Sequence, residues 1–207
     1  MSESDKQSII ERLQAFPTGT LCNADSAAHA MKSALQQLYP GARLAGYART
    51  AKTPYGHNGA IHRAAREVQP GEVLVVDAGG SRDFGHFGDL LATCCQNRGG
   101  VGVVIDGSVR DTVELRKMEF PVFCTGTNPT RSSRSNPGEI NIEVEVGGVS
   151  VVPGDIVIAD EDGVLVIPAD AGERLASAAA EVERKEEEMR AQILQGRSTY
   201  ELFGMGQ

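Results

Sequence analysis

Unbroken runs of aliphatic residues mark the middle of the chain. The segments 72–77 (EVLVVD), 101–105 (VGVVI) and 121–126 (PVFCTG) are such runs, and the segments 88–97 and 111–118 between them have helical character. Strands buried on both faces of a parallel sheet have continuous rather than alternating hydrophobicity, and helices cross over between them. The pattern therefore predicts a central parallel β-α-β-α-β core, with a Gly-rich loop over 78–87 after its first strand.

The amino-terminal segments predict further elements before this core. Residues 1–16 carry apolar side chains at helical spacing, and residues 24–38 (ADSAAHAMKSALQQL) follow Asn23, a favourable helix cap, so both segments predict helices. Residues 42–53 predict a strand, and residues 57–68 predict a helix that ends before a Pro-Gly pair.

The segments after the core predict short strands followed by one long helix. Residues 141–168 contain short aliphatic runs separated by Gly-containing turns, and residues 169–196 are rich in Ala and Glu. The apolar stripe of this helix is thin and is interrupted by Glu186, which suggests contact with another subunit. The fold class expected is a compact α/β/α single domain. We expect an α/β domain over residues 1–168, with amino-terminal helices within 1–40. Residues 169–207 are expected to form a carboxyl-terminal helical extension that reaches a neighbouring subunit.

Composition and charge narrow the classes of function. Hydrophobic residues make up 41% and charged residues 23% of the 207 residues, which is typical of a globular protein. The net charge of −8 and the absence of a Lys/Arg block argue against nucleic-acid and anionic-membrane partners. The polar first residues do not resemble a signal peptide, and no apolar run approaches the roughly 20 residues of a membrane span, so we expect a cytoplasmic protein. The four cysteines lack the spacing of a zinc site, and a structural zinc ion is not expected.

Three charged residues follow two adjacent strands of the expected core. Asp89 lies in a Gly-Asp-Leu-Leu segment at a helix start, and Arg110 and Asp111 follow the strand 101–105 through a Gly-containing turn. Ligands of open α/β sheets bind beyond the carboxyl ends of the strands. We therefore expect both segments to converge on one cleft.

Structural roles explain these residues individually. Asp89 and Asp111 suit helix caps, and Arg110 and Asp111 suit a surface ion pair. The functional alternative is that Arg110 binds a carboxylate or an enolate and Asp111 binds Mg²⁺ or Mn²⁺. Free backbone N–H groups around Asp89, Leu90 and Leu91 would then receive an anionic group, and a small 2-oxo acid fits this combination.

The pattern of Asp89, twenty intervening residues and Arg110-Asp111, with GDLLA at its head and VVIDGSVRD at its tail, resembles the RraA-like family. The resemblance extends from about residue 23 to residue 168 and includes the segments HRAAREVQPGEVLVVDAGG and FPVFCTGTNP. That family includes the class II pyruvate aldolases that act on 4-hydroxy-4-methyl-2-oxoglutarate and 4-carboxy-4-hydroxy-2-oxoadipate.

The resemblance implies a role for each matching residue. Gly88, Asp89, Leu90 and Leu91 would bind the pyruvyl part of the substrate, Arg110 would bind substrate and stabilise the enolate, and Asp111 would bind the divalent metal. Asp89 and Arg110 would be catalytic, with Asp89 acting through a water. The resemblance also implies a homotrimer or homohexamer and, because loss of CO₂ from oxaloacetate gives the same enolate, an oxaloacetate decarboxylase side activity.

Two other functions remain open at this point. The same family contains proteins that regulate ribonuclease activity by protein–protein contact, and the glycines of AGGSRDFGHFG raise the alternative of a nucleotide-binding enzyme. The glycine spacing matches neither the dinucleotide fingerprint nor the P-loop, which makes the latter weak. Roles near the pocket for His57, Asn58, His62 and His86, and for an acidic residue of the carboxyl-terminal helix, stay unassigned.

Overall fold

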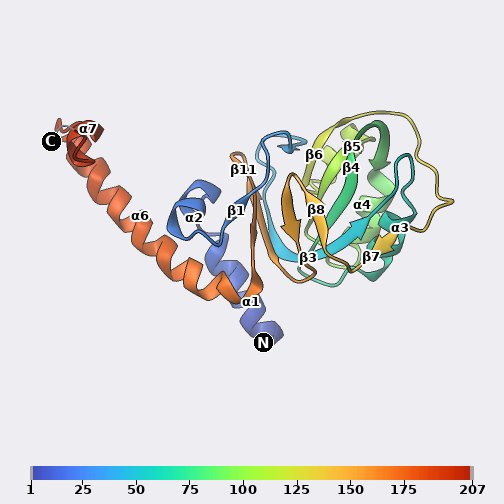
Figure 1. Cartoon of the computed structure of the whole chain (residues 1–207), viewed down its shortest axis with the longest axis horizontal. Helices are drawn as coiled ribbons and strands as arrows, with labels where there is room; N and C mark the ends of the chain where they lie inside the picture. The colour runs from blue at the N-terminus through green and yellow to red at the C-terminus, as the bar shows by residue number, and fades with distance from the viewer. Residues whose placement is uncertain (1, 206–207) are drawn as a thin grey trace.

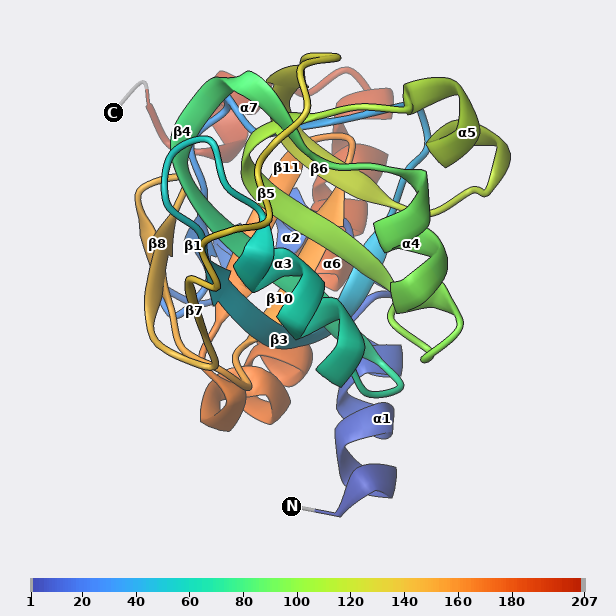
Figure 2. The same ribbon diagram turned by 90° about the vertical axis from the view of Figure 1, so that its right-hand side faces the viewer.

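Within residues 2–205, which this computed structural model describes, one nine-stranded sheet forms the centre of the structure (Figures 1 and 2). Its strands are β1 (His29–Ala30), β2 (Gln36–Gln37), β3 (Leu44–Lys52), β4 (Glu72–Phe87), β5 (Gly102–Val109), β6 (Val122–Thr127), β7 (Glu139–Ile140), β10 (Ile156–Asp160) and β11 (Gly163–Ile167). The order is β1-β11-β10-β3-β4-β5-β6-β2, and β7 pairs with β3. A separate hairpin consists of β8 (Val144–Val146) and β9 (Val149–Val151).

The helices cover different parts of this sheet. They are α1 (Glu3–Leu13), α2 (Thr18–Ala24), α3 (Gly59–Glu67), α4 (Asp89–Gln96), α5 (Thr112–Lys117), α6 (Gly172–Leu194) and α7 (Thr199–Leu202). Buried residues of α3 and α4 pack on β4, β5 and β6, whereas α1 and the first half of α6 pack on β10 and β11. A third cluster lies between the sheet and the β8–β9 hairpin.

The parallel core confirms the prediction from the aliphatic runs. Strands β3, β4, β5 and β6 are mutually parallel neighbours, and α3, α4 and α5 connect them in chain order. Val103 illustrates why these runs lack alternation, because it is fully buried and the residues on both sides of the pleat are buried too. The α/β fold class and the single domain are as expected.

The prediction of a helix over 24–38 is wrong. The helix α2 ends at Ala24, where the predicted one begins, so helices occupy less of the segment 1–40 than expected. An Asx turn, in which the Ala27 N–H donates to Asp25 Oδ1 at 2.9 Å, redirects the chain. The strands β1 and β2 then pair with β11 and β6 at opposite ends of the sheet. Because an unpaired sheet edge leaves backbone groups without partners, this pairing outweighs the helix propensity of the segment.

The prediction of a Gly-rich loop over 78–87 is also wrong, because β4 continues through this segment to Phe87. Its pairing with β5 shifts register between Asp77, Ser81, Gly85 and Phe87, so extra residues on β4 are accommodated as bulges. The two glycines at 79 and 80 have φ of +64° and +69°, which allows the backbone to bulge without Cβ strain. The bulges carry β4 to the point where α4 begins.

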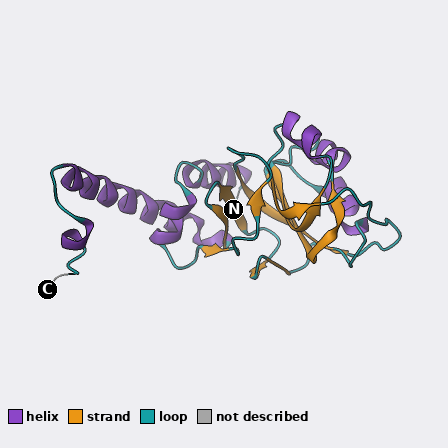
Figure 3. Ribbon diagram, turned by 90° about the horizontal axis from the view of Figure 1, so that it is seen from above, coloured by secondary structure: helices purple, strands orange, loops and turns teal. Residues whose placement is uncertain are grey.

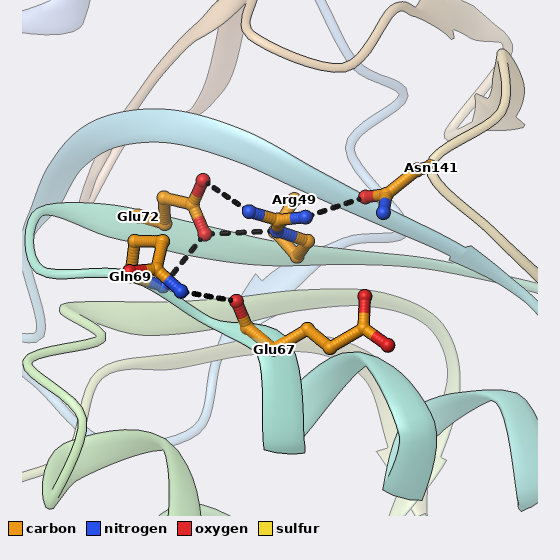
Figure 4. Close-up of polar contacts among 5 residues, drawn as sticks. All are labelled: Arg49, Glu67, Gln69, Glu72 and Asn141. Carbon is orange, nitrogen blue, oxygen red and sulfur yellow. Dashed lines mark hydrogen bonds and ion pairs between the residues drawn. The ribbon is translucent and has the colours of Figure 1, made fainter.

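A half-buried ion pair joins β3 to the start of β4 (Figure 4). The Arg49 guanidinium donates through Nε and Nη2 to both oxygens of Glu72, at 2.9 and 2.8 Å, and both side chains are 18% exposed. Arg49 Nη1 also donates to Asn141 Oδ1, and the Gln69 N–H donates to Glu72 Oε2. The pair therefore connects the sheet to the turn after α3 and to the segment before β8.

The carboxyl-terminal helix is confirmed, and it extends beyond the sheet. A 3-10 turn (Ala169–Ala171) precedes α6, whose buried residues Leu175, Ala176 and Ala179 all lie in its first turns. The rest of α6 projects away from the sheet and ends near α7 (Figures 1 and 3). No helix within residues 2–205 is long and apolar enough to cross a membrane.

Candidate functional site

The carboxyl ends of β4 and β5 lie side by side, as the sequence predicts. Phe87 pairs with Val109, and the Arg110 N–H donates to the Phe87 carbonyl oxygen at 2.9 Å. One residue separates Asp89 from the end of β4, and one residue separates Asp111 from the end of β5. The parallel register alone therefore brings Asp89 close to Arg110 and Asp111, although twenty residues lie between them in the sequence.

Two glycines make room for the Arg110 and Asp111 side chains. A Cβ atom on Gly88 would lie 2.3 Å from Asp111 Oδ2 and 3.2 Å from Arg110 Cγ. A Cβ on Gly85 would lie 2.7 Å from Arg110 Cβ and 2.4 Å from the Asn128 carbonyl oxygen. Gly88 has φ of −156°, an extended conformation open to any residue, so the reason for glycine there is space and not backbone conformation.

Arg110 and Asp111 form an ion pair that is only partly exposed. Arg110 Nε donates to Asp111 Oδ2 at 3.1 Å, with side chains 37% and 31% exposed. Asp111 occupies the N-cap position of α5 in the left-handed region, with φ of 56°, yet its side chain makes no capping hydrogen bond. The capping explanation for Asp111 is therefore wrong, and its carboxylate is held toward Gly88 and Arg110 instead.

The amide cradle expected at the start of α4 is partly closed. The Leu90 N–H donates to Asp89 Oδ1 at 2.7 Å, and the Leu91 N–H donates to the Gly88 carbonyl oxygen at 3.1 Å. The expectation of free N–H groups at both leucines is therefore wrong in this conformation. Leu91 is buried, whereas the Leu90 side chain is 71% exposed.

These residues line one cleft that is open to solvent. Gly88, Asp89, Leu90, Leu91, Arg110 and Asp111 all border it, so the structure brings together every residue to which the sequence analysis gives a role, whereas His57, which has none, does not line the cleft. Arg131, Ser132 and Arg134 complete the cleft and were not predicted. They belong to the turn-rich segment NPTRSSRSNPGE, which has no hydrophobic periodicity from which its position relative to the sheet could be predicted. The two arginines among its turn residues are the one feature of the sequence that points to a role in binding.

The segment 128–138, named here the 128–138 arm, connects β6 to β7 and passes beside α3 (Figure 2). Backbone hydrogen bonds fix it at both rims of the cleft: the Gly85 N–H donates to the Thr130 carbonyl, and the Asn58 N–H donates to the Ser133 carbonyl. A Cβ at position 59 would lie 2.0 Å from the carbonyl oxygen of residue 136, so the arm packs directly against the start of α3.

Asn58, His62 and His86 border the cleft from the side of α3 and β4. His86 is fully buried, with Nδ1 at 3.0 Å from the His57 carbonyl and 3.1 Å from Ser132 Oγ, and burial lowers its pKa below the usual 6.5. Burial also lowers the pKa of His62, and the nearby Arg134 charge adds to this shift. Both imidazoles are therefore neutral at pH 7, and the arginines supply the positive charge of the cleft.

The donor set suits a hard divalent cation with few protein ligands. Among residues 2–205, His, Cys, Asp and Glu side chains form no cluster of three or more that could hold a metal. Asp111 presents a carboxylate that is not used for capping and for which the missing Cβ of Gly88 leaves room. Mg²⁺ commonly binds through one or two carboxylates, with waters and substrate oxygens completing its shell, so the residues present fit such an ion.

Comparison with known proteins assigns the chain to a family. The sequence model of the RraA-like family, described as Aldolase/RraA, matches residues 18–166. A protein of Thermus thermophilus named 4-hydroxy-4-methyl-2-oxoglutarate aldolase is 38% identical over 127 residues, which cover 61% of this chain and 77% of that protein. A Halalkalibacterium halodurans protein that carries the same name provisionally is 34% identical over 160 residues, covering 77% of this chain and 76% of that one.

Solved structures share the fold. The Streptomyces coelicolor protein RraAS2, described as an unusual member of the RNase ES inhibitor RraA family, is 34% identical with a TM-score of 0.80, and the match covers 88% of this chain and 96% of that one. The Thermus thermophilus RNA-processing inhibitor RraA is 33% identical with a TM-score of 0.69, covering 74% and 93% of the two chains.

Proposed function

Because this chain belongs to the RraA-like family, we propose that it is a divalent-metal-dependent class II aldolase, a carbon–carbon lyase. The substrates proposed are 4-hydroxy-2-oxo diacids, either 4-hydroxy-4-methyl-2-oxoglutarate or 4-carboxy-4-hydroxy-2-oxoadipate, which are cleaved to pyruvate and a second oxo acid. The observation that carries the proposal is the convergence of Asp89, Arg110 and Asp111 on one cleft, where Asp111 is free of capping.

Arg110 is proposed to bind the pyruvyl part of the substrate and to stabilise the enolate. Its Nε is paired with Asp111, which leaves the two Nη groups to donate toward the cleft. Cleavage of the C3–C4 bond moves an electron pair into the pyruvyl part, and a fixed guanidinium offsets that negative charge. Loss of one such donor typically lowers kcat by about 100- to 1000-fold.

Asp111 is proposed to hold a Mg²⁺ or Mn²⁺ ion. When bound, such an ion polarises the 2-oxo group of the substrate. The ion pair with Arg110 and the space above Gly88 fix the direction of the Asp111 carboxylate. Gly88, Leu90 and Leu91 border the position where the pyruvyl group of the substrate would lie. Rotation of the Asp89 side chain would free the Leu90 N–H to donate to the carboxylate of that pyruvyl group.

Asp89 is proposed to act as the general base through a water. The C4 hydroxyl must lose its proton as the C3–C4 bond breaks, and a base must reach that proton directly or through one water. Asp89 stands at the first position of α4 at the rim of the cleft, partly exposed, where a water can reach it.

The same site supports a second reaction. Loss of CO₂ from oxaloacetate places the electron pair in the same pyruvate enolate, so Arg110 would stabilise it equally. We therefore propose oxaloacetate decarboxylation as a side activity. Its rate should fall together with that of the aldol cleavage when Arg110 is replaced, because both reactions depend on the same charge.

Assembly and location form a further part of the proposal. A homotrimer or homohexamer accords with the half of α6 that extends beyond the sheet and with exposed apolar residues near its end, Leu194 and Phe203. On this proposal the α/β domain covers 1–168 and the extension over 169–207 contacts a neighbouring subunit. The negative net charge accords with a cytoplasmic enzyme acting on small molecules rather than on nucleic acid.

Regulation of a ribonuclease by protein contact is the second candidate function. The observation that favours it is the similarity to one structure described as an RNA-processing inhibitor and to another described as an unusual member of the RNase ES inhibitor RraA family. The aldolase proposal is stronger because of the partly buried Arg110–Asp111 ion pair and of Gly88, whose lack of a side chain leaves space for the Asp111 carboxylate. A surface used only for protein contact would need neither feature.

The test is Mg²⁺-dependent release of pyruvate from 4-hydroxy-4-methyl-2-oxoglutarate, followed with lactate dehydrogenase. We expect EDTA to abolish activity, Mg²⁺ or Mn²⁺ to restore it, and Asp111→Asn to lower it at least about 100-fold. Glu145→Gln, which removes an exposed carboxylate on β8, is the matched control and should be fully active. Full activity of Asp111→Asn would contradict the assignment, and ribonuclease binding without turnover of any oxo acid would favour the regulator.

A further inference from the structure

We propose that Arg131 and Arg134 form a subsite for the distal carboxylate of the substrate, so that the 128–138 arm makes the cleft selective for dicarboxylic 2-oxo acids. This inference rests on the proposed function and deepens it, because it assigns substrate selectivity to residues outside the group that carries the chemistry. It starts from two arginines that line the same cleft as Asp89 and Arg110.

The guanidinium groups of Arg131 and Arg134 are available to a ligand. Neither forms an ion pair or a side-chain hydrogen bond with any residue between 2 and 205. Arg49 and Arg174 pair with Glu72 and Asp25, whereas exposed arginines such as Arg98 have no ion-pair partner among residues 2–205. Arg131 and Arg134 differ from such residues because both line the cleft that contains Arg110, where the anionic substrate is proposed to bind.

The cleft concentrates positive charge. Arg110, Arg131 and Arg134 all border it, whereas Asp89 and Asp111 are the acidic residues that line it. Arg110 already pairs with Asp111, and neither Arg131 nor Arg134 pairs with Asp89, so the lining keeps a net positive charge from three arginines against two aspartates. A planar guanidinium forms two parallel hydrogen bonds with a carboxylate, so either of these arginines can receive the distal carboxylate.

The arm holds the backbone of these arginines at a fixed place relative to Arg110. Arg131 forms a backbone bridge with Gly85, which packs against Arg110 Cβ, and the backbone of residue 133 bridges to that of residue 57. At the far end of the arm, Arg63 Nη1 donates to the carbonyl oxygens of residues 137 and 138. A segment fixed at both ends loses little further freedom when a ligand binds, which increases affinity.

The surroundings of Arg134 favour an arginine over a histidine as the partner of the carboxylate. Arg134 lies close enough to His62 for its charge to disfavour protonation of the imidazole, which is also partly buried. His62 is therefore neutral at pH 7 and forms part of the wall, whereas a guanidinium side chain carries a positive charge and is the better partner for a carboxylate.

The experiment measures binding and not turnover. The ligands are 2-oxoglutarate, a five-carbon 2-oxo acid with a distal carboxylate, and 2-oxopentanoate, which has the same length and a methyl group at that end. Neither has a 4-hydroxyl group, so neither can be cleaved by the aldol reaction. Isothermal titration calorimetry with Mg²⁺ at constant ionic strength gives both dissociation constants for the wild type, for Arg131→Gln/Arg134→Gln and for the control Arg98→Gln.

We expect the wild type and Arg98→Gln to bind 2-oxoglutarate about 10- to 100-fold more tightly than 2-oxopentanoate, the range for one or two charged hydrogen bonds. The double variant should lose this preference and keep its affinity for 2-oxopentanoate within about twofold. A preference that survives in the double variant, or its absence from the wild type, would overturn the inference. Failure to release pyruvate from a 4-hydroxy-2-oxo diacid would refute the proposed aldolase activity. The binding measurement would still test the subsite, because it does not depend on turnover.

Discussion

Replacing Gly88 by Ala tests the site through space alone. The added Cβ would lie 2.3 Å from Asp111 Oδ2, whereas ordinary van der Waals contact begins near 3.4 Å. The carboxylate must therefore retreat by about 1 Å, and the Arg110–Asp111 pair must move with it because the same oxygen accepts from Arg110 Nε. A misplacement of about 1 Å at a reacting group typically lowers the rate about 100-fold.

The fold should tolerate this change. The extended backbone of Gly88 suits Ala, and overpacking of one methyl group costs about 1–3 kcal/mol, which leaves a folded protein. We expect kcat/KM for pyruvate release to fall by roughly 100-fold and the Mg²⁺ concentration for half-maximal activity to rise. Urea denaturation followed by circular dichroism checks the folding, and the lactate dehydrogenase assay checks the rate.

Gly19→Ala is the matched control for that experiment. Gly19 lies within α2, and an added Cβ would meet only Asp162 Oδ2, at 3.9 Å. Gly19 is the second residue of α2, where alanine suits the helix at least as well as glycine, so the control should be fully active and at least as stable. Gly88→Ala with activity within about threefold of the wild type and unchanged Mg²⁺ dependence would refute the role assigned to the Asp111 carboxylate.

Two further predictions concern stability. Arg49→Met should lower the free energy of unfolding by about 1–3 kcal/mol, because it leaves the half-buried Glu72 carboxylate without its bidentate partner. Adding Glu72→Gln to that variant should cause only a small further loss. Additive losses in a double-mutant cycle measured by urea denaturation would disprove the coupling. Burial lowers the pKa of His62 and of His86 in the folded state, so below about pH 6.5 the unfolded chain binds more protons than the folded one. The free energy of unfolding should therefore decrease as the pH is lowered from about 7 to about 5. His86→Gln should reduce that slope, and an unchanged slope would exclude His86 as its cause.

The sequence predicts the parallel core because local and tertiary preferences agree there. The aliphatic runs of β4, β5 and β6 suit strands buried on both faces, and the helices between them leave few other connections. The placement of Asp89 and Arg110 follows from that topology, since residues just after neighbouring parallel strands share one edge.

The failures of prediction occur where distant contacts decide the conformation. Segment 24–38 has the composition of a helix, but both exposed edges of the sheet need partners, and no local pattern reveals that need. The continuation of β4 to Phe87 depends on bulges opposite β5, and the glycines that allow these bulges make the segment resemble a loop. Arg131 and Arg134 lie in an irregular connection whose path is fixed by backbone bonds to β4 and to the residues just before α3.

The two walls of the cleft have different origins in the chain, and this difference bears on how the protein can change during evolution. One wall is built from the ends of central strands, where nearly every backbone neighbour is buried and few replacements are tolerated. The opposite wall is an irregular connection whose side chains are mostly exposed, so substitutions there carry little penalty in folding. Descendants of this chain can therefore acquire new substrates by altering residues 128–138 while the bond-breaking apparatus is inherited unchanged.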